Sequence, residues 1–235
     1  MQVEHDCPQR CTPQLPAGSV ERRFLAFIDR QAFPCLGAKA SRARRQLQLV
    51  RARDLTRSGD DAAIARHLQS TARLDGRHLF VSVAVLFAGS PDLAEAAFEA
   101  ALWARLESIH AIDRLHHEWD ARVSADPTSP HFSMSVGGKA FYVVGMHPRA
   151  SRPARRFECA ALVFNLHSQF EQLRADGRYG KLRESILKRD VAYAGSVNPM
   201  LAMHGTRSEA RQYSGRDVGD DWVCPFHPVR RSEHT

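Results

Sequence analysis

Arginine is concentrated in one short stretch of the C-terminal half, residues 147–156, which read HPRASRPARR. Four of these ten residues are arginine. The guanidinium group of arginine is a planar fork that binds carboxylates and phosphates through paired hydrogen bonds. The stretch therefore predicts an anion-binding pocket able to hold two carboxylates, although a nucleic-acid contact or a solvated loop would have the same composition.

Two further segments combine polar, aromatic and small residues in a way typical of sites built from loops. Residues 165–171 (NLHSQFE) lie where a predicted strand meets a helix, and His167 there either faces a cofactor or makes a hydrogen bond within the core. Residues 195–226 are too rich in side-chain donors and acceptors for a simple tail. The candidate residues of this segment are Asn198, His204, Glu209, Arg211, Gln212, Tyr213 and Arg216.

The five cysteines, at positions 7, 11, 35, 159 and 224, are odd in number, which argues against a disulfide framework. Cys7 and Cys11 have the spacing of half a zinc site, but no second pair completes it. Cys35 lies in the string FPCLGAKA, between a proline and a glycine, at a predicted helix start. There the helix dipole lowers the pKa of a thiol, and glycine allows a ligand to approach the backbone closely.

The overall charge favours an anionic partner without identifying it. The chain has 33 basic and 26 acidic residues, a formal net charge of +7, and only four of the basic residues are lysine. A coding bias toward arginine, alanine and leucine would give the same ratio, so only clustered arginines are informative. The sequence lacks a Walker A loop, a Rossmann glycine fingerprint and a nucleophile elbow, which weakens nucleotide-binding and serine-hydrolase interpretations.

We expect a cytoplasmic protein with no membrane contact. The N-terminal residues lack a basic region followed by an apolar run, which a secretory signal requires. The longest apolar candidate, residues 79–88, contains a serine and falls well short of the ~18 residues of a membrane span.

The hydrophobic pattern predicts an α+β scaffold for these segments. We expect a mobile arm over residues 1–18, a single domain over residues 19–228 with a mostly antiparallel sheet and a loop-rich C-terminal part, and a tail over residues 229–235. The predicted elements are a helix with Val20, Phe24, Phe27 and Ile28 on one stripe, an Arg-rich helix to about Leu55, a strand over 79–87, a helix from Ser90 to about His117, a hairpin of strands 132–136 and 140–146 around Gly137-Gly138, a strand over 161–164, and an amphipathic helix with Phe170, Leu173, Leu182, Ile186 and Leu187.

Several strings of the sequence resemble the YqcI/YcgG family. They are FPCLGAKA, HPRASRPARRF, LVFNLHSQFEQLR, GSVNPML, HG followed by SEARQYSGR, and WVCPF, and they extend from about Phe24 to Phe226. This family includes haem-dependent N-hydroxylases of guanitoxin and cycloserine biosynthesis. The resemblance implies that the protein binds haem b and uses O2 and external electrons to hydroxylate a guanidine or amine nitrogen of arginine or an arginine-like compound.

The resemblance also implies roles for particular residues. Among single residues, Cys35 is the first candidate for the iron ligand, because a thiolate favours O–O cleavage. The next candidates are the histidines His147, His167 and His204, which taken together are favoured over Cys35 alone. Cys224 is the last candidate. The cations for the haem propionates would be Arg152, Arg155, Arg156, Arg211 and Arg216. Glu171 and Glu209 would hold the cationic head of the substrate, unless they form internal ion pairs. Asn198, Gln212 and Tyr213 would orient oxygen or substrate.

Two other functions remain open. One is a haem-binding sensor or carrier without turnover. The other is a basic nucleic-acid-binding protein, against which the scarcity of aromatic residues among the arginine clusters counts. As partners we expect a small guanidine or amino-acid substrate and an electron-donor protein or reductant. A homodimer stays open as the oligomeric state.

Overall fold

A five-stranded sheet in the order β1-β2-β5-β4-β3 organises the protein. The computed structural model describes residues 15–196, 198 and 206–228. Its elements, in chain order, are α1 (Val20–Asp29), α2 (Leu36–Ala43), β1 (Leu47–Ala52), η1 (Ser58–Asp60), α3 (Asp61–Ala72), β2 (Ser82–Phe87), α4 (Glu95–Asp113), β3 (Met134–Val136), β4 (Lys139–Met146), η2 (Pro153–Arg155), β5 (Ala160–Leu166), α5 (Ser168–Ala175), α6 (Tyr179–Ala194) and α7 (Ala210–Tyr213). The predicted α+β class is confirmed.

The sheet is mixed, although most of its pairings are antiparallel as predicted. β2 with β5, β5 with β4 and β4 with β3 are antiparallel, whereas β1 runs parallel to β2. The prediction of an Arg-rich helix to about Leu55 was wrong in its second half. Helix α2 ends at Ala43, Arg45 adopts a left-handed φ of 57°, and β1 follows. A parallel pair needs a crossover connection, and α3, which the pattern did not predict, lies in that connection.

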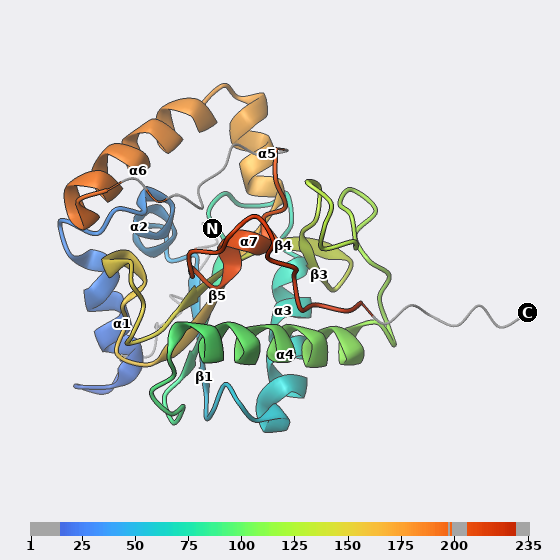
Figure 1. Cartoon of the computed structure of the whole chain (residues 1–235). Coiled ribbons are helices and arrows are strands. Elements are labelled where there is room, and N and C mark those ends of the chain that lie inside the picture. The colour runs from blue at the N-terminus through green and yellow to red at the C-terminus, as the bar shows by residue number, and fades with distance from the viewer. Residues whose placement is uncertain (1–14, 197, 199–205, 229–235) are drawn as a thin grey trace, which may run out of the picture.

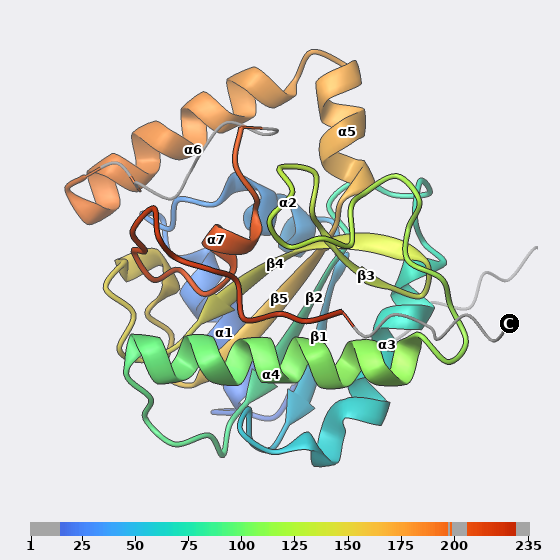
Figure 2. The same cartoon turned by 45° about the vertical axis from the view of Figure 1, so that its right-hand side comes forward.

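One face of the sheet packs on α3 and α4. Helix α4 lies across this face in both views (Figures 1 and 2). Its stripe of Phe98, Leu102, Leu106 and Ile109 is fully buried, and Ile112 on the same stripe is partly buried. The helix approaches β4 so closely that a Cβ on Gly145 would lie 2.8 Å from Leu102 Cδ1.

The other face of the sheet packs on α1 and α2. The predicted α1 stripe of Val20, Phe24, Phe27 and Ile28 is buried, and it contacts the strand residues Ala84, Leu86, Met146 and Ala161. Helix α6 lies on the outer side of α2 in both views (Figures 1 and 2). The predicted single helix after β5 is two helices, because Gly177, with φ 66°, separates α5 from α6.

The predicted hairpin is confirmed. Gly137 and Gly138 have φ values of 64° and 68°, the left-handed backbone that a two-residue turn between β3 and β4 requires. Residues 1–14 of the predicted arm, the tail over 229–235, His204, Cys7 and Cys11 lie outside the described residues. Among the helices that the structure describes, none is long and apolar enough to cross a bilayer.

Candidate functional site

A cavity of about 310 Å³ lies between the α1–α2 face of the sheet and helix α6. We call it the sheet cavity. Because residues opposite each other on neighbouring strands share a face, Ser82, Asn165 and Tyr142 form one row of its floor. Val163 and Val144 form the next row. Across the cavity α6 contributes the apolar side chains Leu182, Ile186 and Leu187. The surface of the site is mostly apolar, as in most ligand pockets, although many polar and charged side chains also line it.

Cys35 lines the sheet cavity at the start of α2, where the sequence predicts a helix start. It is the N-cap residue, and its Sγ accepts a hydrogen bond of 3.4 Å from the backbone N–H of Ala38. Burial raises the pKa of the thiol, while the N–H groups of Ala38 and Gly37 oppose this rise. The prediction that the helix start lowers this pKa is therefore wrong for the protein alone, because desolvation outweighs the helix start.

Arg155 places a buried cation in the wall of the sheet cavity. Its Nη1 donates hydrogen bonds to the carbonyls of Gly145 (3.1 Å) and Tyr213 (3.0 Å), and its Nη2 donates to the carbonyl of Gln212 (2.8 Å). Burial lowers the pKa of Arg155. Within the described residues no carboxylate lies within ion-pairing distance of this guanidinium. The cation is held in place by neutral carbonyls, and its charge is available to an anion in the cavity.

The other predicted arginines do not line the sheet cavity. Arg152 pairs with Asp190 at 2.5 Å, and Arg216 pairs with Glu99 at 2.5 Å. Arg211 lies over the ring of Trp222. The remaining one, Arg156, donates to the backbone carbonyls of Ala150 and Ser151 and faces a different pocket.

Three further arginines line the sheet cavity: Arg174, Arg183 and Arg207. Arg174 follows the cavity residue Phe170 by four positions in α5, so helical spacing places both on one face. That spacing was a usable signal in the sequence.

Glu209 is a buried carboxylate of the sheet cavity, with 9% of its surface exposed, and Asp190, also buried, lines the cavity as well. Burial raises its pKa to about 7, although hydrogen bonds from Ser133 and Tyr213 oppose the rise. The Tyr213 hydroxyl donates to Oε1 of Glu209 at 2.6 Å. The other oxygen, Oε2, lies 3.8 Å from Nε2 of His167. At neutral pH this carboxyl group is poised between its neutral and charged forms.

Glu171, Tyr213, Gln212 and Asn198 differ in where they lie. Glu171 is outside the cavity lining and pairs with Arg174 at 2.5 Å. Tyr213 is fully buried and faces the core rather than the cavity. Gln212 and Asn198 do line the cavity, and Gln212 Oε1 accepts a 2.8 Å hydrogen bond from the hydroxyl of Tyr142. Tyr142, which the sequence analysis did not single out, therefore orients a predicted residue.

The described candidate iron ligands lie on different faces of the sheet. His147 stacks on Phe98 of α4 with ring centroids 4.2 Å apart, on the opposite face of the sheet. Cys224 is buried in the core on that same face. Cys35 and His167 line the sheet cavity, whereas His204 lies outside the described residues. The described residues contain no cluster of three or more His, Cys, Asp or Glu side chains suited to a bare metal ion.

Residues 24–227 match the family model described as the YqcI/YcgG family. The chain belongs to this family. No curated protein and no solved structure matches the chain. The YqcI/YcgG match includes Cys35, Arg155, His167 and Glu209, so every polar group described above in the sheet cavity falls within the family region.

Proposed function

We propose that the protein is a haem-dependent monooxygenase that N-hydroxylates arginine or an arginine-like compound. One observation carries the proposal: three strings of the family region each contribute one chemically distinct group to a single apolar cavity. The groups are the thiol of Cys35 from FPCLGAKA, the guanidinium of Arg155 from HPRASRPARRF, and the carboxyl of Glu209 from SEARQYSGR.

The sheet cavity fits the chemistry of haem b. The group is a flat, largely apolar ring with two carboxylates, and it needs an axial donor on its iron. Val144 and Val163 on the sheet and Ile186 on α6 supply apolar walls on opposite sides. Arg155 supplies a cation that makes no ion pair with a described carboxylate, and Cys35 supplies a donor atom. When bound there, haem would supply the binding and reductive activation of O2.

Cys35 would hold the iron as a thiolate. In the protein alone burial raises the pKa of this thiol, so ligation requires the proton to leave. The N–H groups of Gly37 and Ala38, both directed at Sγ, stabilise the negative charge that then develops. His167 is the alternative donor among the described residues, and its contacts with Glu209 and Glu171 would orient its ring.

Glu209 would bind the guanidinium of the substrate. A buried carboxyl with a pKa of about 7 becomes ionised when a cation approaches, because the opposite charge offsets the cost of desolvation. The bond from Tyr213 fixes the orientation of Glu209, and the amide of Gln212 lies in the same wall of the cavity. Glu171, which pairs with Arg174 outside the cavity, is the weaker of the two predicted acids for this role.

The test begins with haem. Protein produced with iron and a haem precursor should show a Soret band, and the protein purified without haem should gain one on titration with hemin. Incubation with arginine, O2 and a chemical reductant should then yield a product heavier by one oxygen atom, detected by mass spectrometry. Protein that acquires no Soret band would refute the proposal. Haem binding with no product and no spectral response to arginine would favour the sensor or carrier instead.

A further inference from the structure

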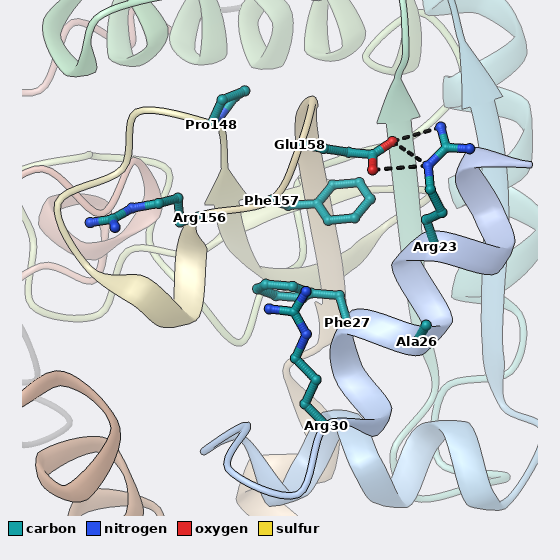
Figure 3. A pocket seen from close by; sticks show the side chains of 8 residues that line it. All are labelled: Arg23, Ala26, Phe27, Arg30, Pro148, Arg156, Phe157 and Glu158. Carbon is teal, nitrogen blue, oxygen red and sulfur yellow. Dashed lines mark hydrogen bonds and ion pairs between the residues drawn. The ribbon is translucent and has the colours of Figure 1, made fainter. Parts of the chain in front are cut away.

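A second pocket, of about 410 Å³, lies on the outer side of α1. We call it the α1 pocket. Figure 3 shows it between α1 and the segment that leads from η2 to β5. Phe27 and Phe157 give it an aromatic floor, and three guanidinium groups surround that floor. The charged residues are Arg23, Arg30, Arg156 and Glu158.

The guanidinium groups of the α1 pocket are held in position. Arg156 donates from Nε to the carbonyl of Ala150 at 2.9 Å and from Nη2 to the carbonyl of Ser151 at 3.0 Å. Arg30 lies over the ring of Phe27, 4.8 Å from its centroid. Groups held in this way lose little conformational entropy when a partner binds.

The α1 pocket carries an excess of positive charge. Arg23 is neutralised by Glu158, whose carboxylate it contacts at 2.7 Å. Within the described residues, no carboxylate lies within ion-pairing distance of Arg30 or Arg156. Figure 3 shows the Arg23–Glu158 pair on one side of the pocket, apart from the other two guanidinium groups.

Two further cations lie beside the pocket, at the turn between α1 and α2. Lys39 Nζ donates to the carbonyl of Arg30 at 2.6 Å, and Arg189 of α6 donates to the carbonyl of Phe33 at 3.1 Å. These bonds place both side chains at the C-terminal end of α1, where cations are favourable. The pocket is thus the centre of a larger basic surface.

The α1 pocket and the sheet cavity lie back to back. Phe24 of α1 lines the cavity and Phe27, three residues later, lines the pocket. In the same way Arg155 lines the cavity and its neighbour Arg156 lines the pocket. The ring of Phe157 contacts both phenylalanines, at centroid distances of 5.1 Å and 5.6 Å. A wall of packed aromatic side chains therefore separates a basic surface from the proposed haem cavity.

We propose that the α1 pocket and its basic surroundings are the docking site of an acidic electron-donor protein. The inference rests on the proposed function, since that reaction needs electrons from outside the chain. In each encounter one electron would leave the reduced donor, which becomes oxidised, and would convert ferric iron in the cavity to ferrous iron. Electron-transfer complexes are small and transient, and complementary charge raises their association rate.

A protein surface fits the α1 pocket better than a small anion does. Glu158 lies in the pocket lining and would repel a small anion enclosed beside it. A surface that presents several carboxylates can pair with Arg30, Arg156 and Lys39 at once and leave Glu158 at its edge. The pairing would be weakened by salt, because Arg30 and Arg156 are exposed and Lys39 is only half-buried.

The experiment uses the full chain with haem bound and a plant-type [2Fe–2S] ferredoxin, an acidic one-electron donor, as the probe. Arg30→Glu should lower the second-order rate of haem reduction by reduced ferredoxin at least about tenfold at low salt, and added salt should shrink the difference. Glu158→Gln should raise that rate. Arg66→Glu is the matched control, because Arg66 is an exposed residue of α3 on the opposite face of the sheet, and its rate should stay within about twofold of the parent.

A binding titration separates this inference from the proposed function. Oxidised ferredoxin should bind the parent chain, with or without haem, more tightly than it binds the Arg30→Glu variant. A Soret band and product formation with a chemical reductant should be the same in that variant as in the parent. Equal effects of Arg30→Glu and Arg66→Glu would overturn the docking site, as would binding of inorganic pyrophosphate in the pocket with no binding of ferredoxin. Failure to bind haem would overturn the proposed function and leave the titration as the test of docking.

Discussion

The hydroxyl of Tyr213 donates a 2.6 Å hydrogen bond to the carboxyl of Glu209, four residues earlier in the chain. Tyr213 is fully buried against α4, while Glu209 lines the sheet cavity. Tyr213 also accepts a bond of 3.1 Å from the backbone N–H of Met134 in β3. One buried network thus ties Glu209 to the sheet, and the protonation of Glu209 should be coupled to folding.

The first prediction concerns stability against pH. Burial raises the pKa of Glu209 to about 7 from its usual value of 4.5, so between these values the folded state binds more protons than the unfolded state. The free energy of unfolding should therefore fall as pH rises from about 4.5 to about 7, by up to roughly 3 kcal/mol from this group. Urea unfolding at several pH values measures this free energy of unfolding. Glu209→Gln should remove this part of the slope, and an unchanged slope would contradict the assignment.

The second prediction concerns substrate binding. If Glu209 binds the guanidinium of arginine, only its ionised form does so, and ionisation increases as pH rises through about 7. The Kd for arginine should therefore tighten about tenfold between pH 6 and pH 8. Isothermal titration calorimetry at each pH measures this Kd. Glu209→Gln should bind arginine weakly at both pH values, whereas Glu171→Gln, altered outside the cavity, should keep the pH dependence.

The third prediction concerns the axial ligand. Cys35→Ser should abolish the ferric spectrum of a thiolate-ligated haem, because serine offers no thiolate to the iron. Cys159→Ser is the matched control, since Cys159 is buried but does not line the sheet cavity, and its spectrum should resemble that of the parent. If His167→Ala loses the spectrum while Cys35→Ser keeps it, the histidine is the ligand.

The sequence predicted correctly those elements that form from a pattern of neighbouring residues. The stripe of Val20, Phe24, Phe27 and Ile28 identified α1, and Gly137-Gly138 identified the hairpin turn. Strand β1 was missed because its arginine-rich surroundings resemble a helix. Its formation depends on parallel pairing with β2, in which Leu47 lies opposite Ser82, 35 positions later. Such a long-range contact leaves little trace in a short window of sequence.

The side chains of the sheet cavity show a similar limit of prediction from sequence. Arg155 and Arg156 are chemically identical and adjacent, yet one faces the sheet cavity and the other faces the α1 pocket. The sequence could identify the cluster as an anion site but could not distinguish the two side chains, because their directions are set by the η2 turn. His147 was a reasonable candidate by type, and the alternation of side chains along β4 places it against α4.

The fourth prediction concerns the glycine of the string SEARQYSGR. Gly215 has φ 84°, and a Cβ there would lie 2.5 Å from Cδ of Arg155. Gly215→Ala should therefore have two effects: it strains the backbone, and its new Cβ clashes with the side chain of Arg155, which carries the buried cation of the sheet cavity. We expect a loss of roughly 2–4 kcal/mol in the free energy of unfolding.

Gly177→Ala separates the two contributions, because Gly177 has a similar φ of 66° and no atom within 4 Å of a built Cβ. It should lose only about 1 kcal/mol, the cost of a left-handed backbone alone. Urea unfolding of both variants gives the difference. Hemin titration then shows whether displacing Arg155 weakens haem binding in Gly215→Ala and not in Gly177→Ala. Equal destabilisation of the two variants would mean that Arg155 moves aside freely, and its position would then not depend on Gly215.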